Sequence, residues 1–245
     1  MKLMVDIGNT RIKWALHDGD QAVVFGKFMQ RDYVNGFEQV PEDSLQAIYY
    51  ASVTSPEKEQ VLVEYFEKRW GAVAIKLHTS DVCCGVSNGY QQPGQLGVDR
   101  WAAIIAARQM FQEPVCVVDC GSAVTVDAID EGGCHLGGYI IPGLSMQQQL
   151  LRHGTAAVDV DDVIVSQSGW GNTTNSCVTH GCAEAVAGLI ERSHRQLEHQ
   201  YGKSVVTVVT GGDAAVILPL LEHQVQHEEH LVLMGMAYMS RTLEG

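Results

Sequence analysis

The 245-residue chain is 46% hydrophobic and 18% charged, so it has enough apolar side chains for one large or two small folded domains. Its formal net charge of −13 argues against nucleic acid as the main partner, because proteins that bind nucleic acid present a basic face. A small anionic ligand remains compatible with this charge, since a few lysines, arginines and backbone N–H groups are sufficient to hold one.

The sequence carries no targeting or membrane-spanning signal. No apolar run approaches the roughly 18 residues that a transmembrane helix needs, so we expect no membrane partner. The apolar run at the N-terminus is interrupted by Asp6, which is unlike a signal peptide. The seven cysteines are scattered and include no Cys-x-x-Cys pair, so we expect reduced thiols in a cytoplasmic protein.

The first half of the chain is predicted to form a mixed sheet with helices on its faces. The expected strands are Lys2 to Ile7, Arg11 to His17, Gln21 to Phe28, Ala47 to Ser52 and Ala72 to Leu77. A short helix is expected over Arg31 to Val40. A longer helix begins at Thr54-Ser55-Pro56-Glu57, where threonine and glutamate have capping-box spacing, and ends at Gly71. This order, three strands followed by alternating helix and strand, predicts a mixed sheet with helices on its faces.

A loop rich in Gly, Gln, Asn and Pro runs from His78 to Leu96, and a helix follows from Gly97. A loop of this length is either functional or disordered. The helix is expected to join an N-terminal domain, residues 1–112, to a C-terminal domain, residues 113–245.

The second half repeats the plan of the first. The predicted elements are strands Val115 to Cys120, Ala123 to Asp130 and His135 to Ile141, a helix from Pro142-Gly143 to about His153, a polar loop Thr155 to Thr173, a helix Thr174 to Tyr201 ended by Gly202, a strand Ser204 to Val209, a helix to Leu221, a short strand near Leu231 and a last helix from about Gly235.

The first candidate site is the hairpin Asp6 to Lys13. An apolar strand ends at Asp6, and Gly8 and Asn9 tolerate the positive φ of a tight turn, whose N–H groups form an anion cradle. Thr10 adds a hydroxyl and Lys13 a positive charge. Because a carboxylate repels phosphate, Asp6 makes sense if Mg²⁺ lies between them. The alternative is an N-terminal hairpin with an ordinary Gly-Asn turn.

The same pattern returns at Val115 to Asp127, where a strand ends at Asp119 and Gly121 and Ser122 follow. The two aspartates are 113 residues apart in a chain a little over twice that length, which indicates an internal duplication. A third glycine turn, Gly211-Gly212, follows a later strand. With no Walker A or Rossmann motif present, duplicated hairpins favour the actin-like, sugar-kinase and Hsp70-like plan, with two domains, each a mixed five-stranded sheet flanked by helices, around a cleft.

Asp99 is the best candidate for a general base. It lies in the first turn of a predicted helix, and phosphoryl transfer to an alcohol needs a positioned acceptor for the hydroxyl proton. Arg100 beside it could bind a substrate carboxylate through two parallel hydrogen bonds. The alternative is structural, because aspartate is a favoured residue at helix starts.

Two other polar groups have structural interpretations. His223 and His227 have the i, i+4 spacing of metal ligands, but no His-Glu-x-x-His motif is present, and the segment is interpreted as a solvated helix end. Cys83 and Cys84 adjoin the long loop, but nothing marks either thiol as activated.

Five motifs together resemble the type III pantothenate kinases. They are DIGNTRIK (Asp6 to Lys13), NGYQQPGQLGVDRW (Asn88 to Trp101), DCGSAVTVD (Asp119 to Asp127), LGGYIIPGL (Leu136 to Leu144) and TGGDA (Thr210 to Ala214). They occur in the family's order and span nearly the whole chain. The resemblance implies a duplicated actin-like fold, a homodimer, and phosphorylation of pantothenate by ATP as the first step of coenzyme A synthesis.

The resemblance also implies roles for particular residues. Asp99 would be the general base. The residues implied to bind pantothenate are Tyr90, Gly97, Val98, Asp99, Arg100 and Thr174, and those implied to bind ATP are Asp6, Ile7, Gly8, Asn9, Thr10, Arg11, Ile12, Lys13 and Ser122. Asp6 would lie near Mg²⁺, and Asp119 would bind a monovalent cation, K⁺ or NH₄⁺.

The sequence departs from the family pattern at two places. Ser122 stands where threonine is most common, and it keeps the hydroxyl. Thr174 is placed by counting seven residues back from Gly181, and its surroundings are less typical, so Thr173 remains the alternative. Two other functions also stay open, a kinase of the same superfold with another acceptor, and a non-enzymatic regulator.

Overall fold

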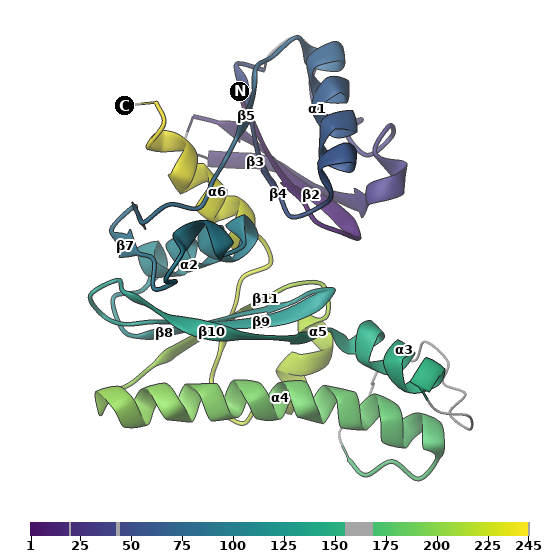
Figure 1. Cartoon of the computed structure of the whole chain (residues 1–245), viewed down its shortest axis with the longest axis vertical. Coiled ribbons are helices and arrows are strands. Elements are labelled where there is room, and N and C mark those ends of the chain that lie inside the picture. The colour runs from purple at the N-terminus through teal and green to yellow at the C-terminus, as the bar shows by residue number, and fades with distance from the viewer. Residues whose placement is uncertain (20, 43–44, 155–168, 245) are drawn as a thin grey trace. The chain divides into compact units, whose positions relative to one another are not determined.

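The computed structural model of the chain (Figure 1) describes residues 1–19, 21–42, 45–154 and 169–244. It divides into two compact units. Unit 1 comprises Met1–Gln109 and His230–Gly245, and unit 2 comprises Met110–Glu229. No helix within the described residues is long and apolar enough to cross a membrane.

Unit 1 contains a mixed five-stranded sheet. Its order is β3-β2-β1-β4-β5, and its strands are β1 (Lys2–Ile7), β2 (Arg11–Asp18), β3 (Gln21–Met29), β4 (Ala47–Ser52) and β5 (Ala74–Lys76). The first three strands pair antiparallel, whereas β4 and β5 run parallel to β1. The strands of the first predicted sheet are therefore confirmed, with β5 shorter than expected.

Helices cover both faces of this sheet. α1 (Pro56–Trp70) packs Leu62, Phe66 and Trp70 against the face that carries Leu3 and Val5. Gly71 ends α1 at φ +61°, as the sequence predicts. The Met4 side chain points to the opposite face of the sheet from those of Leu3 and Val5. It is also buried, because α6 (Leu231–Arg241) packs against β1, β2 and β4.

α6 belongs to unit 1, although the sequence places it in the C-terminal half. It packs against α2 (Val98–Met110) so closely that a Cβ atom on Gly235 would lie 1.8 Å from the carbonyl oxygen of Ala102. Glu244, just beyond α6, accepts hydrogen bonds from Lys2 and from the Tyr49 hydroxyl. The chain therefore returns to its first sheet at its C-terminal end.

Unit 2 repeats the sheet of unit 1. Its order is β10-β9-β8-β11-β12, and its strands are β8 (Val115–Cys120), β9 (Ala123–Ile129), β10 (His135–Pro142), β11 (Val206–Thr210) and β12 (Gln226–His227). As in unit 1, the first three strands, β8, β9 and β10, pair antiparallel, and the last two, β11 and β12, run parallel to β8. The same strand order and directions in both units confirm the predicted duplication and the α/β fold class.

The core of unit 2 lies between this sheet and its helices. α4 (Thr174–Tyr201) contributes Val186 and Ile190, and α5 (Ala214–Ile217), which continues into a 3-10 turn (Leu218–Leu220), contributes Ile217. α3 (Leu144–Gly154) packs against α4. Gly202 ends α4 at φ +63°, as predicted. Most of the predicted loop Thr155 to Thr173 lies outside the described residues.

Residues 31–40 do not form the predicted helix. A 3-10 turn over Gln30–Asp32 is followed by further turns, because the segment is folded around Phe37. The Phe37 ring is fully buried and contacts Trp14, Phe66 and Trp70, and the Trp14 indole donates to Gly36 O at 3.0 Å. Packing of this aromatic cluster outweighs the local helical tendency.

Three further predictions about element ends are wrong. Ser55 precedes α1 without a side-chain cap, and Thr54 Oγ1 instead accepts from Gln30 Nε2 at 3.2 Å, so the capping box does not form. Leu231 begins α6, and the last short strand is β12, which pairs with β11 upstream of it. His223 also lies outside any helix, in the turn that precedes β12.

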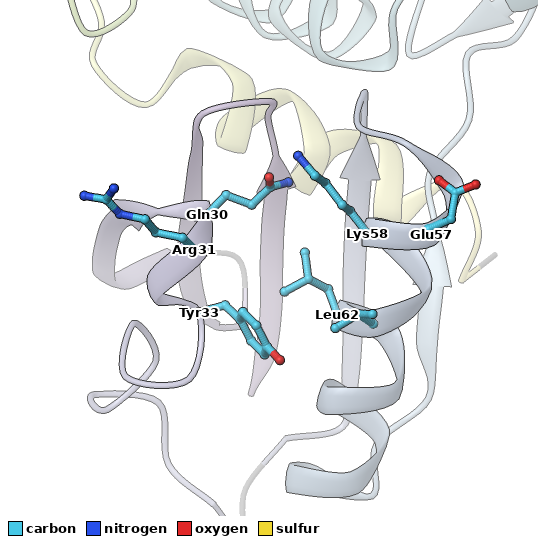
Figure 2. A pocket seen from close by; sticks show the side chains of 7 residues that line it. Gln30, Arg31, Tyr33, Glu57, Lys58 and Leu62 are labelled. Atoms are coloured by element: carbon cyan, nitrogen blue, oxygen red, sulfur yellow. The ribbon is translucent and has the colours of Figure 1, made fainter.

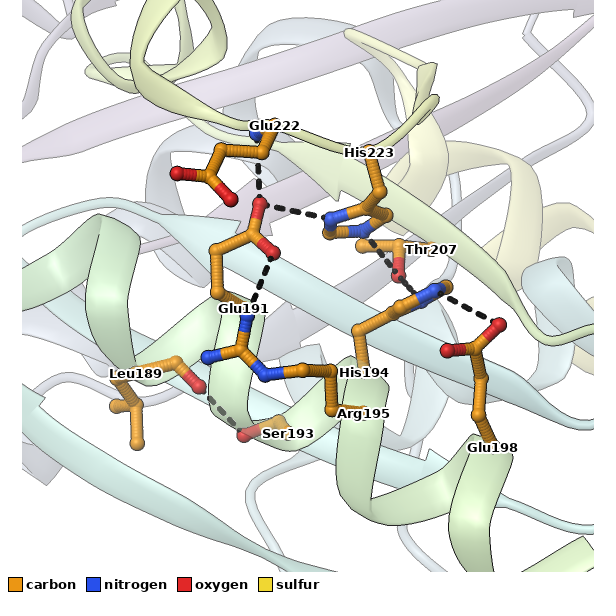
Figure 3. A network of polar contacts seen from close by, with 9 residues as sticks. All are labelled: Leu189, Glu191, Ser193, His194, Arg195, Glu198, Thr207, Glu222 and His223. Atoms are coloured by element: carbon orange, nitrogen blue, oxygen red, sulfur yellow. Dashed lines mark hydrogen bonds and ion pairs between the residues drawn. The ribbon is translucent and has the colours of Figure 1, made fainter.

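A polar network (Figure 3) ties that turn to α4. Glu191 accepts from Glu222 N at 2.7 Å and pairs with His223 Nδ1 at 2.8 Å. The Thr207 hydroxyl joins His194 Nδ1 and His223 Nε2, and the two imidazoles stack with centroids 3.8 Å apart. His223 is therefore not the solvated residue that the sequence indicates.

The pKa values of this network make the stability of unit 2 dependent on pH. Burial lowers the pKa of His194, and the facing His223 lowers it further, while Glu198 and Glu191 act in the opposite direction. Burial opposes the ionisation of Glu191, but its hydrogen bonds from Glu222 N and His223 hold its pKa below the usual value. A histidine with a lowered pKa binds its proton more weakly in the folded state than in the unfolded state.

We therefore expect the melting temperature to be constant above the unfolded histidine pKa, 6.5, and to fall as the pH decreases below it. His194→Gln should reduce this fall, measured by calorimetry between about pH 7.5 and 5.5, a range above the titration of Glu191. His199→Gln, at an exposed position of the same helix, is the control and should keep the wild-type slope. An unchanged slope in His194→Gln would contradict the assignment.

Candidate active site

The β1–β2 hairpin carries the first group of predicted site residues. Asp6 and Lys13 are direct cross-strand partners, so their side chains lie on the same face of the sheet. Asp6 is only 8% exposed, at the end of a buried strand. Thr10 in the turn and Arg11 at the start of β2 are exposed.

Gly8 is required in this hairpin for a different reason from the positive φ that the sequence indicates. Neither Gly8 nor Asn9 has a positive φ. Gly8 N donates instead to Arg11 O at 3.1 Å, and a Cβ atom on Gly8 would lie 3.0 Å from that oxygen. The close approach of two backbone segments therefore explains Gly8, and the positive-φ explanation is wrong.

Gln30 holds the hairpin from outside, which sequence analysis missed. Its Nε2 donates to Gly8 O and to Thr54 Oγ1, each at 3.2 Å, and its backbone N donates to Thr10 O at 2.9 Å. No motif marks Gln30, because it is 22 residues from Gly8 and reaches the turn only when β3 pairs with β2.

The β8–β9 hairpin carries Asp119 and Ser122 in unit 2. Gly121 N donates to Ala123 O at 3.1 Å, and Ser122 is exposed at the tip. Two other segments pack directly on this turn. A Cβ atom on Gly143 would lie 2.3 Å from Gly121 O, and one on Gly211 would lie 2.4 Å from Cys120 O. Gly143 of the LGGYIIPGL motif and Gly211 of the TGGDA motif thus allow backbone to pack on the turn.

Asp119 is surrounded by these backbone segments. A Cβ atom on Gly211 would lie 2.5 Å from Asp119 Oδ1, and one on Gly121 would lie 3.3 Å from the same oxygen. Gly211 has φ +100°, so a side chain there would also be strained. A carboxylate oxygen is a ligand that suits a hard cation.

Asp99 is half-buried in the first turn of α2. Its Oδ1 accepts from Arg100 N at 2.8 Å, and a Cβ atom on Gly97 would lie 2.6 Å from it, so Gly97 leaves room for the carboxylate. Val98 is buried and begins the helix. A helix N-terminus favours a negative charge by about 0.3–1 kcal/mol.

Arg100 and Tyr90 are brought together although they are ten residues apart. Arg100 Nη1 donates to Tyr90 Oη at 2.8 Å, and the guanidinium lies 5.6 Å from the centre of the Tyr90 ring. Arg100 is only 7% exposed. The Tyr90 side chain therefore orients the guanidinium of Arg100, the residue after Asp99.

The loop from His78 to Leu96 is held by its own polar groups. It includes a small hairpin, β6 (Val82–Cys83) and β7 (Val86–Ser87), and a 3-10 turn (Pro93–Gln95). Asn88 Oδ1 accepts from Tyr90 N at 3.0 Å, while its Nδ2 donates to Ser80 O and Pro93 O at 3.3 Å. The length of this loop predicts that it is either functional or disordered, and the prediction of disorder is wrong.

The structure distinguishes the two threonines at the start of α4. Thr173 is the N-cap residue, and its hydroxyl accepts from Ser176 N at 3.1 Å in a reciprocal capping box. Thr174 is the first helical residue, and it is exposed. The Thr173 hydroxyl is therefore engaged in capping α4, whereas the Thr174 side chain takes no part in the cap.

Other polar clusters do not form a site. Among the described residues there is no group of three or more His, Cys, Asp or Glu side chains that could hold a metal ion. Cys83 and Cys84 have sulfur atoms 3.6 Å apart, and burial raises the pKa of Cys84 to about 12, which opposes thiolate chemistry.

Comparison with known proteins decides the family. The family model described as type III pantothenate kinase matches residues 2–196. This chain belongs to the type III pantothenate kinase family. Similar relatives of that name come from Methylobacillus flagellatus, at 37% identity over 98% of each chain, and Nitrosococcus oceani, at 33% identity over 98% of this chain and 94% of the relative. A third, from a Marinomonas species, is 36% identical over 95% of this chain and 92% of the relative.

Solved structures agree on the fold. A conserved Baf family protein from Campylobacter jejuni has a TM-score of 0.61 at 22% identity and covers 99% of this chain and 98% of its own. A 2-dehydro-3-deoxygalactonokinase protein from Sinorhizobium meliloti has a TM-score of 0.57 at 10% identity, covering 99% of both chains. At these identities the likeness concerns the fold alone, which is the predicted actin-like, sugar-kinase type.

The capping geometry gives a test that separates the two threonines. Thr173→Ala should lower the free energy of unfolding by about 0.5–2 kcal/mol, because the hydroxyl that caps α4 is lost. Thr174→Ala, at an exposed position, should change it by less than about 0.5 kcal/mol. Urea unfolding measures both, and equal losses in the two variants would contradict the capping assignment.

Proposed function

We propose that this member of the family transfers the γ-phosphoryl group of ATP to the primary hydroxyl of pantothenate, giving 4′-phosphopantothenate, with Asp99 as general base. Family membership supports the reaction. The observation that supports the role of Asp99 is its carboxylate at the start of α2, fixed by Arg100 N and by the space that Gly97 leaves. Asp99 takes the hydroxyl proton as the oxygen attacks phosphorus.

The acceptor is held by residues on both sides of Asp99. Arg100, oriented by the Tyr90 hydroxyl, pairs with the pantothenate carboxylate, where a guanidinium offers two parallel hydrogen bonds. Gly97 and Val98 shape the backbone next to Asp99. Thr174 donates or accepts one further hydrogen bond, since Thr173 is occupied as the helix cap.

The two hairpins bind ATP. Asp6 to Lys13 and Ser122 contact the phosphates through backbone N–H groups, hydroxyls and the Lys13 ammonium. The buried Asp6 carboxylate at the end of β1 fits a Mg²⁺ ion, which is commonly held by one or two carboxylates together with phosphate oxygens. When bound, Mg²⁺ supplies positive charge at the phosphates. Asp119, beside backbone carbonyls, would hold the monovalent cation, K⁺ or NH₄⁺.

ADP release by the purified protein with MgATP, with and without pantothenate, in K⁺ and in Na⁺, tests this function. The wild type should release ADP only with pantothenate, and faster in K⁺. Asp99→Asn should reduce kcat by roughly 100-fold or more, because an amide cannot accept the proton.

The outcomes of this assay separate the parts of the proposal. Circular dichroism should show that Asp99→Asn is folded, and near-wild-type turnover in that variant would remove Asp99 from the mechanism. Indifference to the cation would remove the Asp119 site. Turnover with other alcohols but not with pantothenate would favour a different acceptor.

We also infer a homodimer in the cytoplasm. The edge strand β10 and the helix α3 after it carry large apolar side chains that are each 40% to 60% exposed, namely Leu136, Tyr139, Ile140, Met146, Leu150 and Leu151. Apolar groups of this kind mark interaction sites. All seven cysteines are free thiols, which suits a reducing compartment.

Ile140→Asp should therefore convert the dimer to a monomer in sedimentation velocity, because a charge would be buried in the contact. Val73→Asp is the matched control, since Val73 is 68% exposed and belongs to unit 1, whereas β10 and α3 belong to unit 2. A wild-type monomer would refute the dimer, and a dimeric Ile140→Asp variant would place the contact on another surface.

A further inference from the structure

Unit 1 contains a pocket that the proposed reaction does not use (Figure 2). It has a volume of about 380 Å³ and lies between the turn after β3 and the first two turns of α1. Small-molecule sites commonly occupy about 300–1,000 Å³. Seven side chains line it, those of Gln30, Arg31, Tyr33, Glu57, Lys58, Val61 and Leu62.

The pocket has an apolar end and a polar end. Figure 2 shows Tyr33 and Leu62 at one end, and Gln30 and Lys58 together at the other. Leu62 is buried, whereas Val61 is 48% exposed at the wall. Figure 2 shows the Arg31 side chain extending away from Gln30 and Lys58, so its guanidinium does not share the polar end. An apolar chain with one polar head matches this division.

The charge of the polar end selects an anion. Lys58 forms no ion pair with any residue in the part of the chain that the structure describes, so its ammonium is available to a ligand. Glu57 opposes an anion, because hydrogen bonds to its own backbone and to Ser55 lower its pKa and keep it charged, but its side chain extends away from Lys58 in Figure 2. The first turn of α1 adds the positive end of the helix dipole.

The polar end of the pocket also contacts the β1–β2 hairpin through Gln30. Gln30 lines the pocket and donates to Gly8 O, and its backbone N donates to Thr10 O. A ligand that displaces or orders the Gln30 side chain therefore changes the support of the hairpin. Because coupling between two sites is reciprocal, the same ligand would change nucleotide affinity.

We propose that this pocket binds a medium-chain aliphatic carboxylate, with its chain against Tyr33, Val61 and Leu62 and its carboxylate at Lys58. We further propose that binding alters the affinity for MgATP through Gln30. The second statement rests on the proposed ATP role of the β1–β2 hairpin, whereas the first does not.

Isothermal titration with octanoate, in the absence of nucleotide, tests the site directly. The wild type should bind one octanoate saturably. Lys58→Gln should weaken binding at least fivefold, and Val61→Trp should abolish it by filling the pocket. Lys68→Gln is the matched control, because Lys68 is an exposed lysine of the same helix outside the pocket lining. Octylamine, with the opposite charge, should not bind.

The outcomes are distinct from those of the kinase assay. No octanoate binding, or equal binding by wild type and a folded Val61→Trp variant, would overturn the site whatever the enzyme turns over. Repeating the ATP titration with saturating octanoate measures the coupling. A shift in the Kd of MgATP that is lost in Gln30→Ala supports it, and an unchanged Kd overturns the coupling.

Discussion

The structure depends on one kind of contact, the packing of backbone directly on backbone at the ends of the central strands. At the β8–β9 turn, Gly143 and Gly211 leave no room for a Cβ atom against the carbonyl oxygens of residues 120 and 121. At the β1–β2 turn, Gly8 approaches Arg11 O in the same way. Larger residues would push these segments apart. The glycines therefore help to fix the ends of β1 and β8, where Asp6 and Asp119 lie.

The same contact explains how the chain closes on itself. Gly235 brings α6 against Ala102 of α2, so the C-terminal helix packs on the first sheet instead of the second. α2 carries Asp99 and Arg100 in its first turn, and this helix is thus held from one side by α6 and preceded by a loop whose own hydrogen bonds fix Tyr90. The proposed base and its neighbour are supported by packed elements on each side, as precise positioning requires.

Predictions from sequence succeeded where a local pattern and the tertiary structure favour the same element. β1, β4, β8 and α4 have the predicted bounds, because apolar runs ended by Asp, Gly or a cap define them locally. They failed where distant packing prevails. Residues 31–40 fold around the buried Phe37 ring, and Thr54 binds Gln30 instead of capping α1. Gln30 itself could not be found, since its partners lie more than 20 residues away along the chain.

The sequence alone determined the duplication, the two hairpins with their aspartates, and the Gly97–Arg100 helix start, because each is a local pattern of strand end, glycine and polar residue. Only the tertiary structure decided that Tyr90 orients Arg100, that Thr173 caps α4 while Thr174 is exposed, and that α6 joins the first unit. These features are contacts between segments or choices between adjacent residues of the same type. They depend on side-chain direction and on the meeting of separate elements, which no local pattern of residues encodes.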